Sequence, residues 1–117
     1  MAGYLTTHVL DTARGCPAAG LRIELFRVED GGRTHLRTVE TNADGRTDAQ
    51  ILPEAEFQVG TYELVFHAGD YLDACGVPPE APRFLDVIPL RFGMSEAMHY
   101  HVPLLLSPFG YSTYRGS

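Results

Sequence analysis

The segment His99-Tyr-His-Val-Pro-Leu-Leu-Leu-Ser-Pro-Phe-Gly-Tyr-Ser-Thr-Tyr-Arg-Gly-Ser117 contains the clearest structural and chemical signals in the chain. Its first part predicts a strand with an apolar core over His99–Leu106, and Ser107–Gly110 has the composition of a turn. A second strand is expected over Gly110–Arg115. The closing Tyr-Arg-Gly-Ser is rich in ring, guanidinium and hydroxyl groups, and we interpret it as part of a functional site.

Five further strands are predicted upstream, because short runs of alternating apolar and polar residues are separated by turn residues. In the first of these strands, His8 lies on the opposite face from Leu5 and Val9, since successive side chains in a strand alternate. The predicted strands are Leu5–Asp11, Leu21–Val28, Thr34–Thr41, Val59–His67 and Phe84–Phe92.

Turn residues and prolines place the remaining elements. Asn42–Gly45 is a predicted turn, because Asn and Asp hydrogen-bond their own backbone and Gly tolerates positive φ, and Arg46 then begins a further strand. Apolar residues at helical spacing predict a short helix over Ala68–Cys75 that stops at Gly76. Pro89 lacks a backbone donor and therefore places its strand at a sheet edge. Seven or eight short strands with at most one helix predict an all-β fold, an antiparallel β-sandwich.

The composition is that of one globular domain covering residues 1–117. Apolar residues make up 44% and charged residues 21% of the chain, which argues against disorder. The formal net charge of −6 argues against nucleic-acid binding. There is no apolar run of roughly 18 residues to span a membrane, and no signal-peptide pattern. We therefore expect no membrane association and a cytoplasmic location, with Cys16 and Cys75 as reduced thiols.

The five histidines are the main candidates for chemistry. His35 and His67 are expected to be solvated or capping groups, whereas His99 and His101 point to the same face of a strand. Such a pair fits an exposed polar strand face, a metal chelate completed by a third ligand, or an acid–base site. Only His8 or a remote carboxylate could complete a zinc site, so the sequence permits a metal without requiring one.

Two further residues carry weak signals when taken separately. A lone strand histidine such as His8 is usually packed or solvated, and an arginine after a turn, such as Arg46, is usually on the surface. The chain contains no Gly-x-Ser-x-Gly elbow, phosphate loop, dinucleotide fingerprint or catalytic carboxylate pair. Residue spacing alone thus predicts a small β-sandwich with a histidine-bearing face.

The strand that carries His101 is apolar on both of its faces, because Val102, Leu104 and Leu106 alternate with Pro103 and Leu105. Neither face can be freely solvated. One face is expected to pack in the core and the other at a subunit contact, the alternative being a strand buried wholly within a monomer.

Three groups of residues occur in the same order along nearly the whole chain as in a known family. They are His8-Val-Leu-Asp11 with Arg14-Gly15, then Asp44-Gly-Arg46, and finally His101-Val-Pro-Leu-Leu-Leu-Ser-Pro through the closing Tyr114-Arg-Gly-Ser117. This pattern resembles 5-hydroxyisourate hydrolases, the transthyretin-related enzymes of purine degradation. The resemblance implies a sandwich of two four-stranded sheets, a homotetramer built as a dimer of dimers, and active sites between the dimers without cofactor or metal.

The resemblance also implies roles for individual residues. It makes His8, Arg46, His101 and Ser117 catalytic, and it makes His8, Arg46, Tyr114, Arg115 and Gly116 substrate-binding. The implied reaction is hydrolysis of 5-hydroxyisourate to 2-oxo-4-hydroxy-4-carboxy-5-ureidoimidazoline during urate degradation. Water attacks an acyl carbon and opens the six-membered ring. An extension beyond Ser117 is expected to damage the site.

The expected chemistry assigns the base to His101, because an imidazole with a pKa near 6.5 is largely neutral at pH 7 and can take a proton from water. His8 would position the water or protonate the departing ring nitrogen, and the order of these two roles stays open. Arg46 would bind the substrate carbonyl and its developing oxyanion.

Rival functions come from other classes. A transthyretin-like carrier of a small aromatic ligand is the main alternative, but in transthyretins the positions of His8 and Arg46 carry Lys and Glu. A zinc-dependent hydrolase using His8, His99 and His101, and a purely structural sandwich module, are the others. Phe109, where many relatives have Tyr, is a small departure from the hydrolase pattern.

Overall fold

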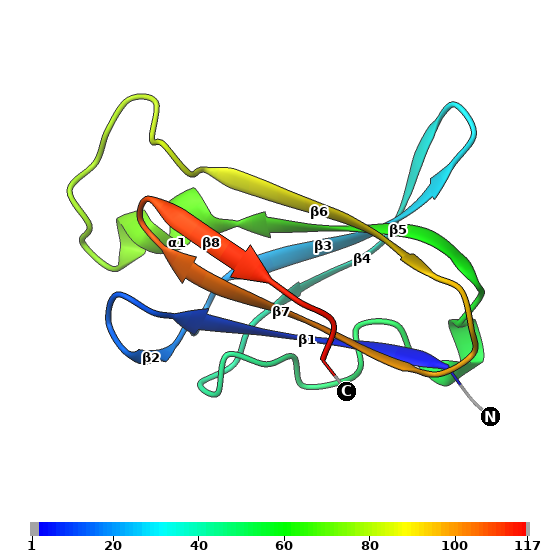
Figure 1. Cartoon of the computed structure of the whole chain (residues 1–117). Helices are drawn as coiled ribbons and strands as arrows, with labels where there is room; N and C mark the ends of the chain where they lie inside the picture. The colour runs from blue at the N-terminus through cyan, green and yellow to red at the C-terminus, as the bar shows by residue number, and fades with distance from the viewer. Residues whose placement is uncertain (1–2, 117) are drawn as a thin grey trace.

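A computed structural model describes residues 3–116, which form two four-stranded β-sheets packed face to face (Figure 1). The first sheet has the order β2-β1-β7-β8, and the second has the order β4-β3-β5-β6. The strands are β1 (Tyr4–Asp11), β2 (Cys16–Pro17), β3 (Arg22–Glu29), β4 (Gly32–Glu40), β5 (Gly60–His67), β6 (Val87–Met94), β7 (His99–Ser107) and β8 (Gly110–Thr113). This architecture confirms the predicted all-β sandwich.

The pairing of β1 with β7 is parallel, whereas the other strand pairs within residues 3–116 are antiparallel. These two strands lie near opposite ends of the chain, and the chain passes through the whole second sheet between them. A parallel pair requires such a long crossover, whereas a hairpin produces an antiparallel one. The sequence analysis expected an antiparallel sandwich throughout, because the alternation within a strand does not reveal the direction of its partner.

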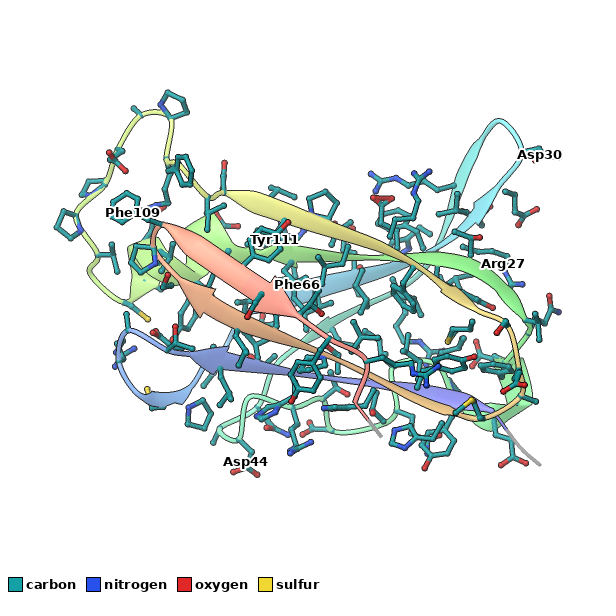
Figure 2. The ribbon with its side chains drawn as sticks, in the orientation of Figure 1. Arg27, Asp30, Asp44, Phe66, Phe109 and Tyr111 are labelled. Atoms are coloured by element: carbon teal, nitrogen blue, oxygen red, sulfur yellow. The ribbon has the colours of Figure 1, made fainter. Side chains whose placement is uncertain are left out.

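The core lies between the sheets and follows from the alternation along each strand. On β1, Leu5 and Val9 are fully buried, and on β7 Leu104 and Leu106 are fully buried. Phe66 of β5 lies between the two sheets (Figure 2). Each such side chain contributes on the order of 1.5–3 kcal/mol when removed from water. The same alternation directs the intervening residues of β1 and β7 to the outer face of the first sheet.

Two predicted features at the sheet margins are confirmed. The short helix α1 (Ala68–Ala74) follows β5 directly and ends before Gly76, whose φ of 78° is the left-handed conformation typical of a helix terminus. Strand β6, which contains Pro89, is the edge strand of its sheet. Cys16 and Cys75 are both free. Between residues 3 and 116 there is no helix long and apolar enough to cross a membrane.

The prediction that Arg46 begins a strand is wrong. Residues 46–53 form a loop that runs beside β1, and two isolated bridges pair its backbone with β1, His8 with Arg46 and Leu5 with Leu52. The bridges are too few to build a ladder, and a short 3-10 helix (Glu54–Glu56) follows the loop before β5 begins. Arg46 is therefore fixed by a turn and a single bridge.

Candidate active site

The outer face of the β1–β7 pair carries a row of ring and hydroxyl groups. Tyr4, Thr6 and His8 project from β1, and His99 and His101 project from β7, all of them partly buried. The parallel register places Tyr4 opposite His99 and Thr6 opposite His101. Side chains that are far apart in the sequence are therefore neighbours on one surface.

His8 and His101 lie close together, as the resemblance implied. Their ring centroids are 6.3 Å apart with an interplanar angle of 34°, and the His99 and His101 rings are 6.2 Å apart. The predicted pairing of His8 with His101 is present in the fold.

Arg46 reaches this face because of the turn that precedes it. The Asn42 side-chain oxygen accepts hydrogen bonds from the backbone N–H groups of Asp44 (2.9 Å) and Arg46 (3.2 Å). Figure 2 shows Asp44 at the outer end of this turn. Gly45 has a φ of 74°, its carbonyl accepts from Val9 N–H at 2.8 Å, and a side chain there would overlap the Val9 carbonyl oxygen. Glycine is therefore needed to bring the turn against β1.

Burial and the Arg46 charge favour the neutral form of both central histidines. Burial and then the Arg46 charge lower the pKa of His8, while a backbone hydrogen bond with Asp44 opposes them. Burial, Arg46, His8 and His99 together lower the pKa of His101. A neutral imidazole has a free nitrogen lone pair and can accept a proton, which is the state that a general base requires.

Gly116 lies against His101. Its N–H donates to the His101 carbonyl at 2.7 Å, and a Cβ at this position would be 2.9 Å from Cδ2 of the His101 ring. The closing segment therefore crosses β7 beside the histidine, and the absence of a side chain permits the approach. Ser117, the remaining predicted catalytic residue, lies outside the described residues.

Tyr114 and Arg115 are placed differently from Gly116. Both line a cavity of about 340 Å³ at the margin between β6 and β8, together with apolar groups such as Phe92 and Val102. The Arg115 guanidinium lies 5.9 Å from the centroid of the Tyr100 ring, which is buried on the inward face of β7. Tyr114 is largely exposed. The structure therefore brings Gly116 to the histidines and leaves the exposed Arg115 at the cavity beside Tyr100.

Two residues of this face were missed by the sequence analysis. The Thr6 hydroxyl lies 2.7 Å from Nε2 of His99 and 2.7 Å from Nδ1 of His101. The Tyr4 ring is stacked on His99, with centroids 4.2 Å apart and an interplanar angle of 10°. The alternation of residues 4, 6 and 8 already placed them on the face of His8, but only the parallel register could reveal their partners.

A second cavity lies directly beside this face. It has a volume of about 220 Å³ and is enclosed between β1 and the loop that begins at Arg46; its lining residues are Thr6, Thr7, Arg46, Thr47, Asp48, Ala49 and Gln50. Within the described part of the chain, no group of three or more His, Cys, Asp or Glu side chains is arranged to hold a metal ion. The side chains of this face offer imidazole, guanidinium and hydroxyl groups.

Fold and site together define a class: a transthyretin-like β-sandwich whose outer face carries neutral histidines beside an arginine. Residues 5–116 match the HIUase/Transthyretin family, and the chain belongs to that family. A 5-hydroxyisourate hydrolase of Mesorhizobium japonicum is 67% identical over 115 residues, which cover 98% of this chain and 93% of the relative.

Two solved structures show how widely the fold is shared. The 5-hydroxyisourate hydrolase of Klebsiella pneumoniae is 34% identical, with a TM-score of 0.82, and the match covers 98% of this chain and 99% of that one. Sea bream transthyretin in complex with thyroxine is 30% identical, with a TM-score of 0.85, over 96% of this chain and 93% of that one. The fold alone therefore does not separate a hydrolase from a carrier.

Proposed function

We propose that this protein hydrolyses 5-hydroxyisourate to 2-oxo-4-hydroxy-4-carboxy-5-ureidoimidazoline in urate degradation, without cofactor or metal. The observation that carries the proposal is the convergence of His8, His101 and Arg46 on one outer face. The proposal treats residues 1–117 as one hydrolase domain in the cytoplasm. The named relatives, at up to 67% identity, support the substrate.

The reaction follows from the chemistry of these groups. Neutral His101 takes a proton from water as the water oxygen attacks an acyl carbon of the six-membered ring. Arg46 donates hydrogen bonds to the oxygen that gains negative charge, and its planar fork suits a carbonyl and an adjacent ring nitrogen. The carbon–nitrogen bond then breaks, the nitrogen receives a proton, and a carboxylate is left. His8 orients the water or supplies that proton.

The closing segment completes the substrate site in this proposal. Gly116 is in place beside His101, and Tyr114, Arg115 and Ser117 are proposed to flank the bound ring. Because Arg115 lies over Tyr100 beside the cavity between β6 and β8, Arg115 would act from the margin of the sandwich. A contribution from a neighbouring subunit at that margin would agree with this placement.

We further propose a homotetramer, a dimer of dimers with the active sites between dimers. Strands β6 and β8 each lie at one edge of their sheet, so within residues 3–116 each has an unpaired backbone edge. Large apolar side chains are exposed beside them, including Phe84 at 69% and Phe109 at 68%. Such exposure favours burial against another copy. Gel filtration with light scattering should give four times the 12.9 kDa chain mass, and a monomer would contradict the assembly.

A carrier of a small aromatic ligand is the second candidate, favoured only by the shared transthyretin fold. A hydrophobic carrier gains little from three titratable groups around one cavity, whereas a hydrolase needs them. The two functions differ in turnover, because a carrier leaves its ligand unchanged.

The direct test generates 5-hydroxyisourate in situ from urate with an oxidase and follows its ultraviolet decay. The wild-type protein should accelerate the decay, and the His101→Ala variant should lose at least about a hundredfold in rate, the lower range for a general base. The rate should survive treatment with a metal chelator. A decay no faster than without protein would contradict the proposal, and loss of activity to the chelator would favour a zinc hydrolase.

A further inference from the structure

The Thr6 hydroxyl lies between two imidazole nitrogens and has only one proton to donate. It is 2.7 Å from Nδ1 of His101 and 2.7 Å from Nε2 of His99. It can donate to one of the two rings only, so at least one ring must donate to it. The three groups therefore form a hydrogen-bonded chain in which the proton positions on both rings depend on Thr6.

We propose that Thr6 and His99 form a proton relay that sets the tautomer of His101 and passes its Nδ1 proton on to His99 when His101 takes a proton from water. This inference rests on the proposed function. Thr6 and His99 are positioning residues in it, since they act through His101 and not on the substrate. In the sequence analysis His99 was one member of a histidine pair, and Thr6 had no assigned role.

The resting state follows from what a base at His101 requires. His101 donates Nδ1–H to the Thr6 oxygen, Thr6 donates its O–H to Nε2 of His99, and Nε2 of His101 keeps its lone pair for water. The nitrogen that carries the proton in a neutral histidine is fixed by the hydrogen bond that the other nitrogen makes. Thr6 thus selects the tautomer with a free Nε2.

The relay also solves an electrostatic difficulty of the site. A proton on Nε2 makes His101 an imidazolium beside Arg46, and Arg46 is one of the groups that lower the His101 pKa. If the Nδ1 proton moves to Thr6 while the Thr6 proton moves to Nε2 of His99, His101 is neutral again and the positive charge lies on His99. No proton is gained or lost in this exchange.

The same exchange changes the role of His101 during the reaction. After the first transfer, His101 carries its proton on Nε2, which makes it a donor toward the substrate. When His101 gives that proton to the departing ring nitrogen, the relay runs in reverse and restores Nδ1–H. One imidazole can therefore act first as base and then as acid, while the stacked Tyr4 ring keeps His99 in the plane that faces Thr6.

The kinetic test compares three variants by their rates on 5-hydroxyisourate generated in situ. Thr6→Val keeps the shape but loses the hydroxyl, and it should lower kcat about 10-fold with little change in KM, less than loss of the base itself. Thr6→Ser keeps the hydroxyl and should restore kcat to within about threefold of the wild type. Thr12→Val is the matched control. The Thr12 hydroxyl also donates a hydrogen bond to β7, to the Leu106 carbonyl (2.9 Å), which lies away from the histidines. Thr12→Val should keep the wild-type kcat.

Nitrogen-15 NMR of the histidine rings provides a readout that does not depend on activity. His101 should carry its proton on Nδ1 in the wild type and on Nε2 in Thr6→Val. His99→Phe preserves the stacking on Tyr4 and removes the acceptor of the Thr6 proton, so it should lower kcat and leave the Thr6 hydroxyl free to donate to Nδ1 of His101.

The outcomes separate the two claims. Wild-type protein without hydrolase activity would overturn the proposed function, while the ring spectra would still decide whether Thr6 sets the tautomer. An active wild type whose Thr6→Val variant keeps both kcat and the Nδ1–H tautomer would overturn the relay. A raised KM with unchanged kcat in Thr6→Val would also contradict it, because it would assign Thr6 to substrate binding.

Discussion

The two outer faces of this sandwich both carry histidines, but the histidines have opposite partners. On the β1–β7 face, His8 and His101 lie beside Arg46. Burial and the positive Arg46 charge lower the pKa values of both histidines. On the face of the second sheet, Nε2 of His67 lies 2.7 Å from a Glu24 oxygen, and Nε2 of His35 lies 3.6 Å from the other Glu24 oxygen. The same side chains are placed in two different electrostatic settings.

The comparison shows how neighbours decide what an imidazole does. Beside Arg46 and partly buried, an imidazole stays neutral and can accept a proton. Beside Glu24, an imidazole donates a hydrogen bond to a carboxylate, and the hydrogen bond from His67 lowers the pKa of the Glu24 carboxyl. The first setting suits catalysis, and the second suits attachment of β5 and α1 to β3. Variants that alter either setting test this distinction.

The largest effect is expected from removing the Arg46 charge from the β1–β7 face. Arg46→Ala should lower kcat/KM by about 10²–10³-fold, the range for loss of one donor to a developing oxyanion. Steady-state rates on 5-hydroxyisourate measure the effect. Arg22→Ala is the matched control, because Arg22 contacts His67 of the second face at 3.2 Å, and it should leave kcat/KM unchanged. Equal losses in both variants would remove the distinction between the faces.

A smaller effect is expected from crowding His101 without changing any charge. In Gly116→Ala the added Cβ would be 2.9 Å from the His101 ring and should displace it, lowering kcat about 10-fold, within the range for ångström-scale misplacement. Gly32→Ala on β4 has open space around its Cβ and serves as the control. Wild-type kcat in Gly116→Ala would show that the closing segment does not position His101.

The pH dependence of turnover should differ from that of an ordinary histidine. Because the pKa values of His8 and His101 are lowered, the acid limb of kcat/KM should have its midpoint below 6.5, and activity falls only when the pH drops through that lowered value. Arg46→Gln removes a cause of the shift, so the midpoint of its residual activity should move to higher pH. A midpoint that stays fixed in Arg46→Gln would contradict the role assigned to the Arg46 charge.

The smallest effect is expected on the second face and concerns stability alone. Folding lowers the pKa of Glu24, so the folded protein binds fewer protons than the unfolded chain near this pH. The stability that this adds to the folded state is present above pH 4.5 and is lost as the pH falls through the lowered pKa. Glu24→Gln should remove the contribution of Glu24 to the fall in unfolding free energy at acid pH, and it should leave kcat/KM unchanged. Urea unfolding at pH 3 to 6 measures it. If the free energy of unfolding has the same pH dependence in Glu24→Gln and in the wild type, the hydrogen bond from His67 does not stabilise the Glu24 carboxylate.

The sequence predicted local features well and long-range pairing poorly. Alternation placed His8 and His101 on strand faces, Pro89 indicated an edge strand, and Gly76 indicated the end of α1. The parallel register of β1 with β7 was not predictable, because it arises from a crossover through the other sheet, and with it the place of Thr6 between two histidines was missed. Arg46 was expected in a strand, but a turn and one bridge are enough to hold it.

The most direct test of the account compares His101→Ala with His67→Ala in the same assay for 5-hydroxyisourate decay. Each variant removes one imidazole from one face, and circular dichroism checks that both remain folded. The account predicts a loss of at least about a hundredfold for His101→Ala and an unchanged rate for His67→Ala. Similar rates in the two variants would contradict the claim that the β1–β7 face performs the hydrolysis.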